Sequence, residues 1–224
     1  MTTLAEFYTL VSSEIRRGTS LDTHIPKKVQ QAVRWMEEQH TFRHMEHYAA
    51  LTLPSTGTQP RAIAIPTGFK KMLGFRGILD DQGDGEYFDL TKIDFYDISR
   101  IETDRPSAYW QDGMDYFWLD NTPDQDYDAE MAYVGFTVLG TVTSAEPYVI
   151  QNFEGIVLDE TMIRMAPLMR DPAVVGLYKP NRDEMMKSVI DTDIEGRQSW
   201  QSESAQYGWE VKERINLDQN GSLT

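Results

Sequence analysis

Three of the four histidines in this chain lie close together. His40, His44 and His47 follow an i, i+4, i+7 spacing, and Glu37 precedes them by about one turn. On one unbroken helix these four side chains would share a face and could bind Zn²⁺ or Ni²⁺. The order His-Glu-x-x-His of zinc hydrolases is absent, and the helix could end near residue 41. The sequence therefore predicts no native metal site. If a metal were bound, these four residues would be the candidate ligands. The alternative role for them is a polar face near a subunit contact.

A second cluster has part of a calcium-binding pattern. Asp124, Asp126 and Asp128 alternate as they do in an EF-hand loop. However, Ala129 occupies the position of the turn glycine, and Gly135 occupies that of the bidentate glutamate. We therefore interpret this segment as an acidic turn and predict no cofactor.

Charge is segregated along the chain. Residues 80–130 contain sixteen Asp and Glu residues against three Lys and Arg residues, within a total net charge of −15. Residues 51–79 have the opposite sign and contain no carboxylate; their basic residues are Arg61, Lys70, Lys71 and Arg76. Such segregation presents distinct surfaces to distinct neighbours, so Lys70, Lys71 and Arg76 are predicted to contact an acidic surface on another subunit or partner.

Composition excludes several classes of function. The chain has 224 residues and no cysteine, which excludes disulfides, thiolate ligands and thiol nucleophiles. We find no apolar run of about 18 residues and no signal-peptide pattern at the N-terminus, so no membrane contact is expected. A sequence pI of about 4.6 makes tight binding to the DNA backbone unfavourable. Phosphate-binding glycine loops and Gly-x-Ser-x-Gly elbows are also absent, and we predict no catalytic residue.

Hydrophobic periodicity predicts an α+β fold. Apolar residues recur every three or four positions in residues 1–52 and 150–204, which predicts the N-terminal and C-terminal helices of one bundle, with a break at Asp171-Pro172. The first helix is indicated by Leu4, Phe7, Val11 and Ile15. Residues 53–149 switch to alternating runs and turns, which predict an inserted antiparallel β domain. Residues 205–224 are predicted to be an extended tail.

Within the β region, particular elements are expected. Met72 to Leu79 and Ala129 to Leu139 are predicted strands, and Leu90 to Ile101 is predicted to be a short helix.

Several segments, taken in order, resemble a known protein family. In the β region they are Arg105-Pro106-Ser107-Ala108-Tyr109-Trp110, then Phe117-Trp118-Leu119 with Pro123, then Tyr133-Val134-Gly135-Phe136. In the helical regions they are Val29 to Glu37 followed by His40 to Met45, and the pair Glu154 to Met169 and Asn181 to Trp200. Over roughly residues 4–203 the chain resembles the head-to-tail adaptor (connector) proteins of short-tailed bacteriophages.

The resemblance implies a structural virion protein in the neck, between the capsid portal and the tail. It implies a ring of identical subunits, usually twelve, with the portal protein above and tail nozzle or tail tube and fibre proteins below, assembled in the host cytoplasm. DNA would pass through without specific binding, since an acidic wall repels a duplex with one negative charge per about 1.7 Å. Candidate channel-facing residues are Asp80, Asp81, Asp84, Asp124, Asp126 and Asp128; a solvated surface that keeps the subunit soluble is the alternative for them.

Partner contacts are also expected in the tail. Trp209, Val211, Ile215 and Leu217 are too few to form a core, and we expect them to become ordered by docking on the portal. A flexible end with no partner is the alternative for this segment. The rival functions are a tail-associated glycan-binding or cell-wall-hydrolysing protein with paired carboxylates, and a metal-binding helical protein. No pair of carboxylates in the sequence has distinguishable environments, so the structural function is the prediction.

Overall fold

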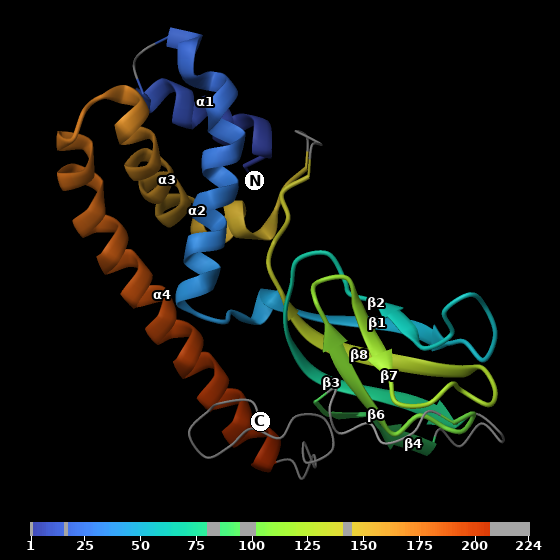
Figure 1. Cartoon of the computed structure of the whole chain (residues 1–224). Coiled ribbons are helices and arrows are strands. Elements are labelled where there is room, and N and C mark those ends of the chain that lie inside the picture. Colours follow the sequence, from blue (N-terminus) through green and yellow to red (C-terminus); the bar gives the residue numbers. More distant parts are fainter. Residues whose placement is uncertain (1, 16–17, 80–85, 95–101, 141–144, 207–224) are drawn as a thin grey trace. The chain divides into compact units, whose positions relative to one another are not determined.

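The computed structural model describes residues 2–15, 18–79, 86–94, 102–140 and 145–206, with the backbone alone described for 18–19 and 198–206. The chain divides into two compact units. The β unit contains residues 46–135, and the helical unit contains the described residues before and after it. Figure 1 shows the blue N-terminal helices in the same unit as the gold and the orange-red C-terminal helices. The predicted α+β class, with a β insertion between helices, is confirmed.

The first half of the helical unit follows the predicted pattern. Helix α1 (Leu4–Ile15) is followed by the 3-10 helix η1 (Gly18–His24), α2 (Ile25–Gln39) and the 3-10 helix η2 (Arg43–Met45). The buried side chains of α1 recur every three or four positions, and they are Leu4, Phe7, Val11 and Ile15. Helix α2 has Pro26 in its first turn, where a missing N–H costs no hydrogen bond, and it buries Val29, Val33 and Met36.

The second half consists of α3 (Tyr148–Met169) and α4 (Ala173–Gln206). Helix α3 ends because Arg170 adopts a left-handed conformation, with φ 54°, and donates its N–H to the carbonyls of Ala166 and Pro167. The Asp171 carboxylate then accepts the Ala173 N–H at 3.1 Å and begins α4. The predicted break at Asp171-Pro172 is therefore confirmed.

The β unit consists of two four-stranded sheets. The first has the order β1 (Glu46–Leu53), β8 (Tyr127–Gly135), β3 (Phe69–Leu79) and β4 (Glu86–Asp89). The second has the order β2 (Ala62–Ala64), β7 (Tyr116–Leu119), β6 (Ala108–Asp112) and β5 (Thr91–Lys92). The described pairings are antiparallel except β5 with β6.

Both sheets supply alternate side chains to one core. Phe75 of the first sheet packs edge-on against Tyr109 of the second, with ring centroids 5.4 Å apart, and Tyr109 packs in the same manner against Phe117 at 5.6 Å. Edge-to-face contacts of this kind stabilise the fold beyond what the burial of apolar area contributes. Leu53, Leu119 and Met131 complete the centre.

Three predictions within this region are corrected. Residues 46–53 form strand β1, although the N-terminal fifty residues were predicted to be helical, because they alternate and pair with β8 along their whole length. Thr91 and Lys92 form β5 in place of the start of a helix; most of the remainder of that predicted helix, residues 95–101, lies outside the described residues. The strand predicted to reach Leu139 ends at Gly135.

Two glycines of β3 provide a matched test of packing in the β unit. A Cβ atom on Gly77 would lie 2.1 Å from Cζ of the Phe88 ring, whereas one on Gly74 would meet no atom within 4 Å. We expect Gly77→Ala to lower the free energy of unfolding by about 1–3 kcal/mol, because the ring must leave its place over the backbone. Gly74→Ala should change it by less than about 1 kcal/mol. Urea denaturation measures both, and equal effects would contradict this account of the packing.

Candidate functional site

The histidines do not share one helical face. Helix α2 ends at Gln39, and His40 is extended, with φ −149° and ψ 149°. His40 Nε2 lies 2.8 Å from Asp193 Oδ2 on α4, and His44 Nε2 lies 3.0 Å from Glu37 Oε1 on α2. His47 belongs to β1, where its ring packs beside Tyr133. Within the described part of the chain, no three His, Asp or Glu side chains form a group suited to a metal ion.

Glu37 is a fully buried carboxylate that holds the chain as it returns from the β unit. It accepts the Thr137 N–H at 2.9 Å and the Thr137 hydroxyl at 2.6 Å. Two turns earlier on α2, the Gln30 amide donates to the Thr137 carbonyl at 2.9 Å and accepts the Leu139 N–H at 2.8 Å. These two side chains satisfy backbone groups that a neighbouring strand would otherwise satisfy. Their seven-residue spacing is the sequence signal for this role.

Residues 40–45 are clamped to the described C-terminal part of α4. Besides the His40–Asp193 contact, Arg197 donates to the Thr41 carbonyl at 2.8 Å and Arg43 donates to the Gly196 carbonyl at 3.2 Å. Burial acts to raise the pKa of Asp193, but the hydrogen bond from His40 and the charge of Arg197 outweigh it and lower that pKa.

A charged network joins α4 to α2 and α3. Arg182 of α4 pairs with Glu160 of α3, and its guanidinium carbon lies 4.2 Å from the centre of the Trp35 ring on α2. The Asn181 amide donates to Asp159 at 2.6 Å, and burial raises the pKa of Asp159. Both carboxylates are therefore committed to partners in the helical unit, which does not favour a role for them as a catalytic pair.

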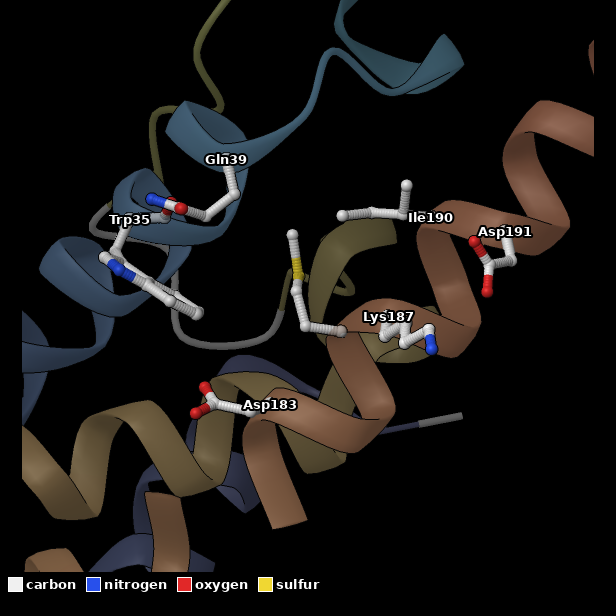
Figure 2. A pocket seen from close by; sticks show the side chains of 7 residues that line it. Trp35, Gln39, Asp183, Lys187, Ile190 and Asp191 are labelled. Carbon is white, nitrogen blue, oxygen red and sulfur yellow. The ribbon is translucent and has the colours of Figure 1, made fainter. Parts of the chain in front are cut away.

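A groove of about 330 Å³ lies beside this network, between α2 and α4. Figure 2 shows Trp35 and Gln39 of α2 opposite side chains of α4. The α4 side chains that line the groove are Asp183, Met186, Lys187, Ile190 and Asp191. An apolar lining with a mixed-charge rim suits the side chain of a protein partner. None of the helices in the described part of the chain has the length and apolar content that a membrane crossing needs.

The basic candidates lie on β3. Arg76 is already paired within the first sheet, since its guanidinium contacts the Glu130 carboxylate on β8 at 2.5 Å and lies 3.9 Å from the centre of the Tyr87 ring on β4. Lys71 is exposed and Lys70 is half-buried at the Phe69 end of the strand. Of the three basic candidates, Lys71 is therefore the exposed one.

The acidic candidates near β8 are exposed and partly used in local contacts. Asp126 accepts the Ser55 N–H at 2.6 Å and the Ser55 hydroxyl at 2.7 Å, and these bonds lower its pKa. Asp124 accepts the Tyr127 hydroxyl, and burial together with this bond raises the pKa of Tyr127 to about 12. Asp128 lies exposed on β8.

Seven candidates lie outside the described residues: Asp80, Asp81, Asp84, Trp209, Val211, Ile215 and Leu217.

Comparison with known families decides what kind of protein this is. Residues 2–205 match the family described as SU10 adaptor protein. The chain belongs to the SU10 adaptor protein family. No curated protein matches the chain. The match covers both units and agrees with the resemblance to phage head-to-tail adaptors found in the sequence.

Membership in the SU10 adaptor family indicates the general role and location of this protein. The protein is a structural adaptor of a bacteriophage virion, located in the neck, and its family points to a non-enzymatic role. The family also implies that this protein contacts other structural proteins of the phage.

The clamp on residues 40–45 gives the adaptor a pH-dependent contribution to stability. Because the pKa of Asp193 is held below its ordinary value of 3.8, the carboxylate stabilises the fold above that value, and this contribution is lost as pH falls through the lower pKa of the folded protein. The difference in free energy of unfolding between wild type and Asp193→Asn should therefore shrink from about pH 4 to pH 2. Denaturant titrations across this range measure it. Asp191→Asn, at an exposed position on the same helix, is the control, and the same pH dependence in both variants would contradict the assignment.

Proposed function

We propose that this adaptor forms a ring of twelve identical subunits that joins the portal protein to the tail. In this proposal the ring holds the tail nozzle or tail tube and fibre proteins below, lines the DNA exit channel, and assembles in the host cytoplasm. The observation that carries the proposal is the family match over residues 2–205.

The surface of α4 supports a role in assembly. Of its described side chains, Arg182 and Met186 are the buried ones, whereas Leu177 is 71% exposed and Ile194 is 40% exposed. A long helix with so little burial is stabilised further when a partner covers it. Neighbouring subunits, the portal or a tail protein would supply that cover in the assembled neck.

The charge of the protein supports passage of DNA. The net charge is −15, and Asp124, Asp126 and Asp128 are exposed in the β unit. Such a surface in the channel would give no counterion-release contribution to DNA binding, so the duplex could slide. We propose these residues, with Asp80, Asp81 and Asp84, as channel-facing.

The direct test mixes the purified adaptor with the portal protein of the same phage and collects two-dimensional class averages by electron microscopy. We expect ring views of the adaptor and side views with added density at one end of the portal. The proposal would be overturned by two results together. The particles would contain portal alone, and the adaptor would stay monomeric even at concentrations well above those in the assembly reaction.

Lys70 and Lys71 provide a test of the contact surfaces. We expect the double variant Lys70→Glu, Lys71→Glu to assemble at least about tenfold more slowly than wild type, because two favourable charges become repulsive at an acidic partner surface. The wild-type rate should fall as salt is raised. The double variant Lys27→Glu, Lys28→Glu makes the same change in charge on α2 and should assemble normally. Light scattering follows the rate, and equal rates for wild type and the β3 variant would refute the assignment.

A further inference from the structure

Strand β1 has an open side. It forms an edge of the first sheet, where β8 pairs along one side of it and no described strand pairs along the other. Its register with β8 continues without a bulge from Glu46 opposite Val134 to Leu53 opposite Tyr127. Natural edge strands are commonly protected by lysine, proline, bulges or short length, and this eight-residue strand has none of these. It therefore offers a regular row of backbone groups to another strand.

The core is incompletely covered at the same edge. Ala49 and Leu51 pack against the buried cluster of the β unit but are themselves only half-buried, whereas Leu53 is fully buried. Tyr48, on the opposite face, is 71% exposed. A strand added beside β1, with apolar side chains on the inner face, would complete the burial of Ala49 and Leu51.

One segment of the chain has the sequence for such a strand. From residue 209 to residue 217, apolar residues occupy every second position except Glu213; they are Trp209, Val211, Ile215 and Leu217. The intervening positions are polar or charged: Glu210, Lys212, Arg214 and Asn216. Alternation with period two is the pattern of a half-buried strand, and nine residues match the length of β1.

The charges are complementary as well. On the outer face of β8, the exposed Asp128 lies opposite Thr52 of β1, and Glu130, which also pairs with Arg76, lies opposite Ala50. A strand whose apolar residues face the core would place Lys212 and Arg214 on that outer face, from where long side chains can reach across Ala50 and Thr52. Opposite charges on neighbouring strands favour this pairing and its register.

We propose that residues 209–217 of one subunit add as a strand to the open edge of β1 in a neighbouring copy. The backbone would supply the affinity, and the alternating side chains would supply the specificity. This inference rests on the proposed ring, because a head-to-tail contact that closes on itself fills every open β1 edge. It assigns the tail to the adaptor itself, where the sequence alone suggested the portal.

Absence of cysteine from the chain permits a direct test by cross-linking. Two single variants, Ala50→Cys and Arg214→Cys, are prepared separately, one with a size tag, then mixed, assembled and oxidised. We expect a disulfide-linked dimer that contains one copy of each variant, since paired strands bring Cα atoms within about 6 Å. Lys212→Cys and Asn216→Cys cover a shift of register by two residues. Ala5→Cys, exposed on α1, replaces Ala50→Cys as the control and should give no such dimer with Arg214→Cys.

A second pair of variants separates the two faces of the strand. Ile215→Lys and Asn216→Lys add the same charge at adjacent positions, but only the first lies on the proposed inner face. We expect Ile215→Lys to lower the yield of rings and of cross-linked dimer about tenfold or more, because it removes apolar burial and buries a charge. Asn216→Lys should leave both yields unchanged within about twofold. Far-ultraviolet circular dichroism of each free subunit checks that the variants are folded.

The outcomes distinguish this inference from the proposed function. Wild-type rings with the mixed dimer support both. Wild-type rings with no mixed dimer in any register, or with as much dimer from Ala5→Cys as from Ala50→Cys, overturn the inference and leave the ring intact. Absence of wild-type rings in class averages overturns the proposed function and the inference with it.

Discussion

One buried cation joins three helices of the helical unit. Arg182 belongs to α4, pairs with Glu160 of α3 and lies over the Trp35 ring of α2. A buried pair that loses one partner leaves an uncompensated charge, at a cost of about 3–5 kcal/mol. Met186 is the other buried side chain among those described on α4, so this cation is one of the two buried side chains that α4 contributes to the helical unit. Asp193 and Arg197 of α4 also form the clamp on residues 40–45.

Burial is distributed differently in the two units, and the difference suits an adaptor. In the β unit, aromatic side chains from both sheets form a core that needs no ion pair at its centre. In the helical unit, α4 contributes little apolar burial and is held by polar contacts, which leaves much of its surface for other molecules. The charged residues that the sequence suggested as partner contacts also differ in burial: Arg76 is half-buried and pairs with Glu130 inside the β unit, whereas Lys71, Asp126 and Asp128 are exposed.

Features that depend on residues close together in the sequence were predictable. The α1 stripe, the break at Asp171-Pro172 and the strands that include Phe75 and Met131 follow from periodicity and turn chemistry, which act over a few residues. The order of motifs was specific enough to indicate the adaptor family. Strand β1 escaped prediction because its inner face offers only Ala49, Leu51 and Leu53, and its stability comes from pairing with β8, about 80 residues later.

The sequence by itself thus determined the α+β class, the positions of most helices and strands, and the family. Only the tertiary structure decided which charged side chains serve the fold. Glu37 meets Thr137 from 100 residues away, and Arg182 meets Glu160 from a different helix. The tertiary structure also separated the histidine stripe, because α2 ends before His40, and it placed β1 at an edge of the first sheet among the strands that it describes. Hydrogen bonds and ion pairs depend on the tertiary structure because they act over a few ångströms in space, whatever the distance along the chain.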